Sequence, residues 1–287
     1  MRKSFWELAT IFGGFRKEML AIDYLFNGLE FRSDTALRSL TIKKFINNYY
    51  FRSWACRNSI TYTSIEDLME DLGVNFFHSG SSGAKFDFSL DEFLMYMETV
   101  YNLVSINIKA DHSIIETVLQ IKHNIKIDCE RIGLEIRKIG DEKYIIVEKD
   151  AAATAVADKY ADVDLAFSHK VIEYNHFLLR GDIERKREIL LAIGQKFEPI
   201  RRRLEDGPFK SVSEDARTLL NNLNIRHDNI SPEDKSHYNA VVDQMPNGNL
   251  EEWYDKTYNI LLLALLADDF SALHKEVGAL KAQIGSK

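Results

Sequence analysis

The stretch LEIRKIGDEKYIIVEK, Leu134 to Lys149, interrupts a chain whose other segments carry mostly helical signatures. Within it, LEIRKI and KYIIVEK have the residue pattern of strands, and Gly140-Asp141-Glu142 between them can form a three-residue hairpin loop. An isolated hairpin is only marginally stable in water, so this one must pack on helices. The sequence therefore predicts a mainly α fold in which a single β-hairpin lies between two helical domains.

Helix-start signals on both sides of the hairpin support this division. Thr63-Ser64-Ile65-Glu66 and Ser89-Leu90-Asp91-Glu92 are typical capping boxes, each followed by an apolar helical pattern. We expect an N-terminal helical domain over residues 1–128. The predicted C-terminal domain, residues 129–287, comprises the hairpin and a bundle of four to five helices.

Composition limits the class of protein. The net charge of −7 does not predict nucleic-acid binding by bulk charge, although residues 1–57 carry ten basic against five acidic side chains. The two cysteines, Cys56 and Cys129, form no CxxC pair, which excludes a disulfide framework and a zinc ribbon. The longest apolar run, Ile260 to Ala267, is too short to span a bilayer, and no signal peptide is evident. We expect a soluble cytoplasmic protein.

The main candidate site lies in LLNNLNIRHDNISP, Leu219 to Pro232. If the helix continues to Asn229, then Asn222, Arg226 and Asn229 share one face, with His227 a quarter turn away. Arginine can bind a phosphate through two hydrogen bonds, and histidine can transfer a proton near neutral pH. The set suits a phosphodiester substrate without a metal or cofactor.

The same residues also have a purely structural interpretation. Cations near a helix C-terminus interact favourably with the negative end of the helix dipole, and Asn229 can adopt the left-handed cap conformation. In that case Arg226 and His227 close a helix or take part in an interior salt bridge, and they bind no substrate. The sequence leaves both interpretations open.

Two other sets of residues are candidates for substrate binding. His169, Glu173 and His176 have helical spacing, and Glu173 or His176 could face the Arg226 helix; a solvated or hydrogen-bonded helix face is the structural alternative. No metal is predicted there, because an HExxH pattern is missing. In KKFINNYYFRSWACRN, the cations Lys43, Lys44 and Arg52 alternate with aromatic residues, a pattern that suits single-stranded nucleic acid or an ordinary amphipathic helix.

The last long helix has more apolar surface than one face requires. Trp253, Tyr254 and Tyr258 precede a leucine run, and part of this surface could bury against a second copy in a homodimer. The alternative is a central helix of the bundle, apolar on nearly all sides.

Three segments carry a resemblance to a known family: RGDIERKREILLAIGQKFEPIRRRL, LLNNLNIRHDN and LEEWYDKTYNILLLALLADDF, within residues 130–280. Together they resemble the C-terminal part of bacterial abortive-infection proteins of the AbiJ-like kind, whose helical half is similar to HEPN domains. The resemblance implies an antiphage-defence effector that binds RNA and cleaves it without metal, as a dimer. Arg226 would stabilise phosphate charge, His227 would act as acid or base, and Asn222 and Asn229 would orient the substrate.

This sequence departs from the HEPN pattern in one respect. The family places a histidine four to six residues beyond the polar residue that follows the arginine, whereas here His227 follows Arg226 directly and His237 lies beyond Pro232. The departure favours an alternative function. The chain would then be a non-catalytic HEPN-like scaffold or sensor subunit that binds a partner protein, encoded in the same operon, in a defence complex.

Overall fold

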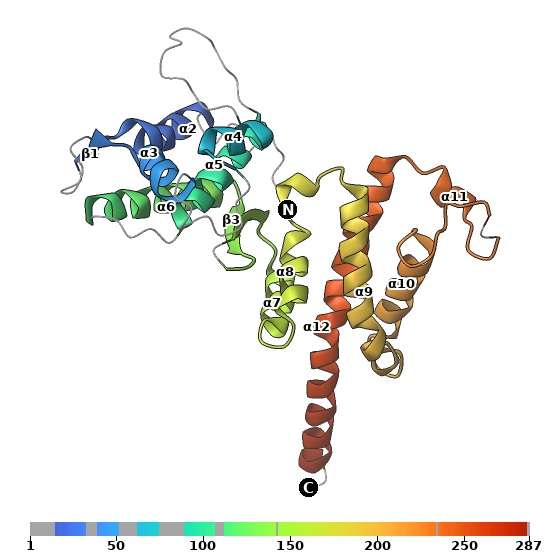
Figure 1. Ribbon diagram of the computed structural model, residues 1–287. Helices are drawn as coiled ribbons and strands as arrows, with labels where there is room; N and C mark the ends of the chain where they lie inside the picture. The colour runs from blue at the N-terminus through green and yellow to red at the C-terminus, as the bar shows by residue number, and fades with distance from the viewer. Residues whose placement is uncertain are drawn as a thin grey trace. The chain divides into compact units, whose positions relative to one another are not determined.

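The computed structural model is mainly α-helical and divides into two compact units, residues 1–148 and 149–287 (Figure 1). It describes residues 15–32, 39–51, 62–74, 89–106, 112–141, 143–233 and 235–285. The predicted fold class is confirmed. The predicted domain boundary after residue 128 is not confirmed. The division between the two units falls after residue 148, so the hairpin belongs to the first unit.

The first unit is built from helices and short strand pairs. The helices are α2 (Phe15–Asp23), α3 (Ile42–Ile46), α4 (Ile65–Asp71), α5 (Leu90–Ser105) and α6 (His112–Arg131), with π-helical turns at Tyr24–Gly28 and Asn47–Phe51. The strands are β1 (Phe31–Arg32), β2 (Ser39–Leu40), β3 (Leu134–Lys138) and β4 (Tyr144–Glu148). The β1–β2 pair adds to the single predicted hairpin; strands of two residues are too short to show a period in sequence.

Side chains of α5 explain why the hairpin belongs to this unit. The Asn102 amide accepts a hydrogen bond from the Tyr144 backbone N–H at 2.9 Å and donates one to the Tyr144 carbonyl at 2.8 Å. The Glu98 carboxylate accepts the Ile146 N–H at 2.7 Å. The edge of β4 that β3 leaves unpaired therefore finds its partners on α5, and the edge is not left open.

The second unit is a helical bundle. Its helices are α7 (Ala151–Tyr160), α8 (Leu165–Glu173), a 3-10 turn (Phe177–Leu179), α9 (Ile183–Glu205), α10 (Lys210–Asn222), α11 (Ala240–Asp243) and α12 (Asn247–Gly285). Helix α9 packs against both α12 and α10. Its approach to α10 is close at Gly194, where a Cβ atom would lie 2.9 Å from the Leu220 side chain. A larger residue at this position would require the Leu220 side chain to shift.

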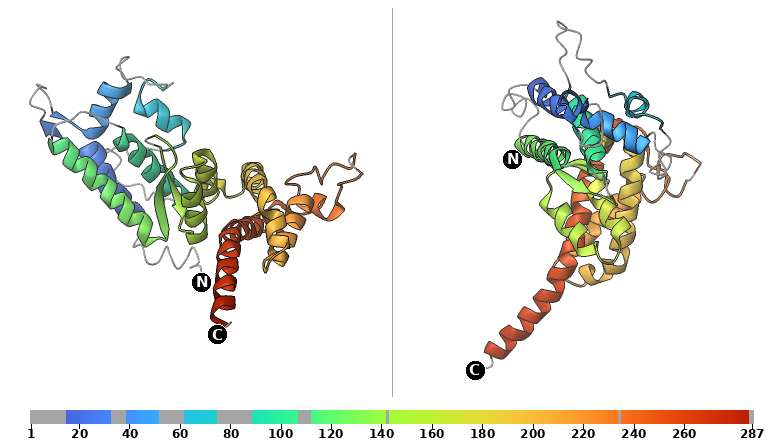
Figure 2. Two further views of the ribbon diagram at one scale, coloured as in Figure 1. Left: turned by 90° about the horizontal axis from the view of Figure 1, so that it is seen from below. Right: turned by 60° about the vertical axis from the view of Figure 1, so that its left-hand side comes forward.

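Helix α12 is the central helix of this bundle along its first half. Tyr254 and Tyr258, which were candidates for a dimer surface, are 0% and 2% exposed in the core of their own unit, so the central-helix interpretation is correct for them. Trp253 is partly exposed, with Lys256 over its ring. The helix is 39 residues long, and its C-terminal part extends beyond the neighbouring helices of the unit (Figures 1 and 2).

Within the described ranges, no helix combines the length and apolar character that crossing a bilayer requires.

Candidate functional site

Helix α10 ends at Asn222, seven residues earlier than the predicted end at Asn229. Asn224 takes the left-handed conformation with a φ of 56°, so the helix cannot continue through it. The predicted common face of Asn222, Arg226 and Asn229 therefore does not exist. A sequence signal for this earlier helix end is the run Asn221-Asn222-Leu223-Asn224, because asparagine side chains compete with the helix for backbone hydrogen bonds.

Two asparagines fix the loop that follows α10. The Asn229 side-chain oxygen accepts the Asn224 N–H at 2.7 Å, and the Asn224 side-chain oxygen accepts the Asn229 N–H at 3.1 Å. The Asn229 amide also donates to the His237 carbonyl at 2.6 Å. Asn229 is 1% exposed, so its polar atoms satisfy the backbone of a buried loop and do not face a substrate. Asn222 is exposed, and its amide donates to the Thr218 carbonyl of its own helix at 2.8 Å.

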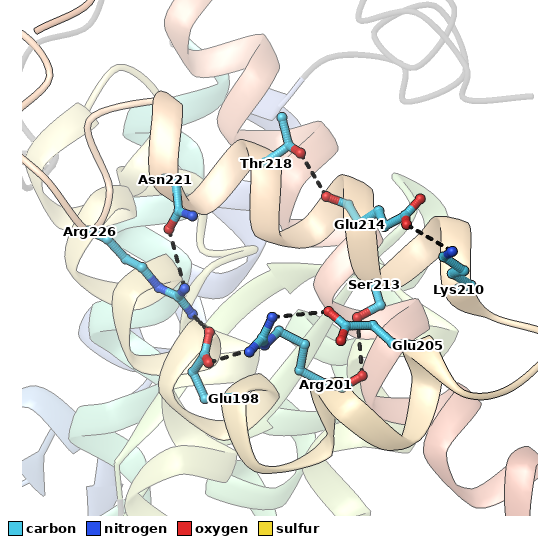
Figure 3. A network of polar contacts seen from close by, with 9 residues as sticks. All are labelled: Glu198, Arg201, Glu205, Lys210, Ser213, Glu214, Thr218, Asn221 and Arg226. Carbon is cyan, nitrogen blue, oxygen red and sulfur yellow. Dashed lines mark hydrogen bonds and ion pairs between the residues drawn. The ribbon is translucent and has the colours of Figure 1, made fainter. Parts of the chain in front are cut away.

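The Arg226 guanidinium is held by groups of α9 and α10 (Figure 3). It forms an ion pair with the Glu198 carboxylate and donates to the Asn221 side-chain oxygen at 3.3 Å and the Gly194 carbonyl at 3.5 Å. Its side chain is only 20% exposed. The candidate phosphate-binding cation is thus already neutralised by a carboxylate of its own chain.

The pair continues into a longer ionic chain along α9. Glu198 lies 3.5 Å from the Nε atom of Arg201, whose guanidinium donates to Glu205 at 3.0 Å. The Ser213 hydroxyl of α10 donates to the Arg201 carbonyl at 3.3 Å (Figure 3). Charges alternate in sign from Arg226 to Glu205, so the chain ties the C-terminal half of α9 to α10 and to the loop after it.

His227 has a neighbour that the sequence did not reveal. Its ring stacks on His237 with centroids 4.0 Å apart and an interplanar angle of 13°, and the Ser236 hydroxyl lies 2.8 Å from Nδ1 of His237. The loop turns back so that two residues separated by Pro232 meet. The Asn224–Asn229 pair and the Asn239 N–H, which donates to the Asn229 carbonyl at 2.8 Å, produce this return.

Glu173 and His176 lie elsewhere in the bundle. Glu173 is paired with Arg185 at 2.6 Å, and Arg185 precedes Glu198 on α9 by thirteen residues, about 20 Å along a helix axis. Helix α8 ends at Glu173, so His176 leaves the face predicted for it and contacts Phe177. Neither residue completes a site at Arg226. Within the described ranges, no three His, Cys, Asp or Glu side chains form a group that could hold a metal.

The basic cluster of the first unit is only partly described. Lys43 forms an ion pair with Glu66 at 2.8 Å, and Lys44 is exposed on α3. Phe45 and Ile46 are core residues, in keeping with an amphipathic helix, whereas Tyr49 is exposed. Arg52 lies outside the described residues. A nucleic-acid surface here remains a prediction.

A second polar cluster, not anticipated from sequence, lies inside the bundle. Lys186 is 6% exposed, and its ammonium group lies 2.8 Å from both Glu251 and Asp255 of α12. The Tyr174 hydroxyl donates to Asp255 at 3.1 Å. Burial raises the pKa of Glu251, but the hydrogen bonds from Lys186 and from the Gly181 N–H outweigh it, and the net pKa is lowered. The cluster is an ionic contact between α9 and α12 in which one ammonium group is shared by two carboxylates.

No family model, curated protein or solved structure matches the chain. The resemblance to abortive-infection proteins therefore remains a prediction.

Proposed function

We propose that this chain acts by binding other macromolecules, as a non-catalytic helical scaffold. The observation that carries the proposal is the engagement of Arg226 with Glu198, Asn221 and Gly194. A phosphate at Arg226 would have to displace the Glu198 carboxylate, a fixed anion of the same chain. The exchange would separate that carboxylate from Arg226, leave it only the contact with Arg201, and place it beside the incoming negative charge, which costs free energy.

A second candidate function is supported by one observation, the His227–His237 pair. Two imidazoles can catalyse phosphodiester transfer in RNA: one accepts the proton of the 2′-hydroxyl as its oxygen attacks phosphorus, and the other donates a proton to the departing 5′-oxygen. The products are a 2′,3′-cyclic phosphate and a free 5′-hydroxyl. However, rings stacked at 4.0 Å leave no room for a phosphate between acid and base, so this function requires the rings to separate.

The two functions differ in what they predict for RNA. The purified protein should be incubated with total RNA in EDTA, beside the His227→Ala/His237→Ala double variant and Arg226→Ala. The scaffold proposal predicts intact RNA in every sample. Cleavage that persists in EDTA and is lost in the double histidine variant would overturn it in favour of the ribonuclease.

The antiphage-defence role rests on the resemblance of residues 130–280 alone. It is tested by expressing the chain in a bacterial host and measuring survival after phage infection. A scaffold with this role predicts that the double histidine variant protects as well as the wild type. Loss of protection in that variant, with normal expression, contradicts the scaffold, and absence of any protection by the wild type contradicts the defence role.

A further inference from the structure

The C-terminal part of α12 carries a continuous apolar stripe on its solvent-facing side. Leu263, Phe270, Leu273, Val277, Leu280 and Ile284 make up this stripe, which we call the tail seam. Each member is between 38% and 66% exposed. Six large apolar side chains along one face of one helix form more than the scattered exposure that is normal for a protein surface.

The spacing of the tail seam is that of a coiled coil. Successive members are separated by seven, three, four, three and four residues, and Leu266 fills the one missing position. With Leu263 at position a of a heptad, the a positions hold Leu263, Phe270, Val277 and Ile284, and the d positions hold Leu266, Leu273 and Leu280. Three unbroken heptads of this kind are the pattern by which one helix packs along another.

The seam members from Leu273 to Ile284 are separate from the face that α12 uses inside its own bundle, whereas Phe270 lies where the helix leaves the bundle. That inner face includes Leu261 and Leu265, both 0% exposed. Near the point where the helix leaves the bundle, Asp268 pairs with Arg203 at 2.8 Å, Asp269 pairs with Lys159 at 2.7 Å, and Phe270 packs against Phe209. Beyond them the helix continues to Gly285 past its neighbours (Figure 2). The seam residues Leu273, Val277, Leu280 and Ile284 in this part are exposed.

We propose that the tail seam binds the tail seam of a second copy of this chain, in a parallel, two-stranded coiled coil. This inference rests on the proposed function, because it takes the chain to be a binding protein. It adds the partner that the tail seam binds.

The charged residues beside the seam favour a second copy in parallel orientation. The e positions hold Ala267, His274 and Lys281, and the g positions hold Asp269, Glu276 and Gln283. In a parallel pair each g residue faces the following e residue of the partner, so Glu276 meets Lys281 twice, once on each side. In an antiparallel pair g faces g and e faces e, which would place acidic residues together and basic residues together.

The residue types within the seam favour two strands. All three d positions hold leucine, and the last two a positions hold the β-branched Val277 and Ile284. Leucine at d with valine or isoleucine at a is the combination that selects parallel dimers over larger assemblies. The apolar seam would supply the affinity, while the Glu276–Lys281 pairs would set the orientation, because exposed ion pairs contribute little energy.

Sedimentation of the full chain tests the association. At about 100 μM, where a micromolar dimer is almost fully associated, the wild type should sediment as a dimer. Leu280→Glu, which places a charge at a d position, should weaken the dimer at least about tenfold. Ala279→Glu adds the same charge one residue away, off the seam, and should stay dimeric; equal helicity by circular dichroism shows that both variants fold.

A cysteine placed at the end of the seam tests the orientation. In a Cys56→Ser background, Ile284→Cys puts the two sulfur atoms side by side in a parallel dimer, and mild oxidation should link the chains. In an antiparallel dimer the same positions lie about 30 Å apart and no link forms. A dimer without the link overturns the parallel arrangement.

A monomeric wild type, or a dissociation constant that Leu280→Glu leaves unchanged, overturns the coiled coil altogether. Neither result affects the scaffold proposal, whose failure would appear instead as EDTA-resistant RNA cleavage.

Discussion

Asn229 was expected to contact a substrate, but the buried loop after α10 depends on it. Its side chain holds two backbone groups of that loop, the Asn224 N–H and the His237 carbonyl. Asn229→Ala should therefore lower the free energy of unfolding by about 1–3 kcal/mol, because buried backbone groups lose their partners. Urea unfolding measures the change.

Asn222→Ala is the matched control for this substitution. Asn222 is exposed and bonds only within its own helix, so its replacement should change stability by less than about 0.5 kcal/mol. Equal effects of the two substitutions would contradict the structural role of Asn229.

Asp128 makes stability depend on pH. Burial, and to a lesser extent the nearby Glu18, raise the pKa of this carboxyl from 3.8 to about 6 against the opposing effect of Arg131. Between these two values the folded state binds more protons than the unfolded state, so stability falls as pH rises through this window. Above pH 6 the buried charge should cost about 1–3 kcal/mol.

Asp128→Asn should remove this cost. The variant should be more stable than the wild type at pH 7.5 and equal to it below about pH 4, as measured by urea unfolding at both pH values. Glu130→Gln removes a charge from the exposed side of the same helix and should leave the pH dependence unchanged. An Asp128→Asn variant with the wild-type pH profile would show that the carboxyl is not destabilising.

At the scale of the element, the sequence predicted those helices and strands whose boundaries depend on local chemistry. Ser89 and Glu92 form the predicted capping box, with the Glu92 carboxylate accepting the Ser89 N–H at 2.8 Å. The hairpin at 134–148 also appears where expected. The end of α10 was missed because the reciprocal Asn224–Asn229 bonds depend on a loop that returns from His237, and helical spacing contains no information about that return.

The candidate site was predicted less well than the elements, for the same reason. The partner of Arg226, Glu198, lies 28 residues earlier in the chain, on helix α9, and the sequence does not show that the two meet. The stacking of His227 on His237 likewise depends on the path of the loop. The sequence identifies the candidate side chains. Which of them pair depends on how α9 packs against α10 and on the path of the loop after α10.

The stability of the C-terminal part of α12 should depend on the helix propensity of its own residues. Gly278 occupies a position off the seam, and a Cβ atom there would meet no other atom within 4 Å. Gly278→Ala should therefore stabilise the tail helix by about 1 kcal/mol and slow amide hydrogen exchange over residues 273–285 several-fold. Ala279→Gly is the reverse substitution at the neighbouring exposed site and should speed exchange; unchanged exchange in both variants would contradict an autonomous tail helix.

Charge exchange within the tail tests the proposed Glu276–Lys281 pairing. Glu276→Lys should weaken the dimer a few-fold, because it places like charges opposite each other at each g–e contact. Adding Lys281→Glu to Glu276→Lys restores opposite charges and should restore the dissociation constant. A double variant that is as weak as the single one would contradict the pairing.

At the scale of the whole molecule, the structure separates the hairpin from the bundle in which sequence reasoning had placed it. The hairpin completes the first unit through Glu98 and Asn102, and the second unit is helical throughout its regular elements. Ionic contacts recur across that second unit, from the Lys186 cluster to the Arg226–Glu205 chain. We infer that these contacts help to hold α9 against α10 and α12.

The central claim, that Arg226 is structural, is tested most directly by a double-mutant cycle with Glu198. The free energy of unfolding should be measured for the wild type, Arg226→Met, Glu198→Gln and the double variant. We predict a favourable coupling of roughly 1 kcal/mol or more, because the guanidinium is largely removed from water and the carboxylate is its charged partner. A coupling of zero, with each single variant as stable as the wild type, would contradict the account and leave Arg226 available for a substrate.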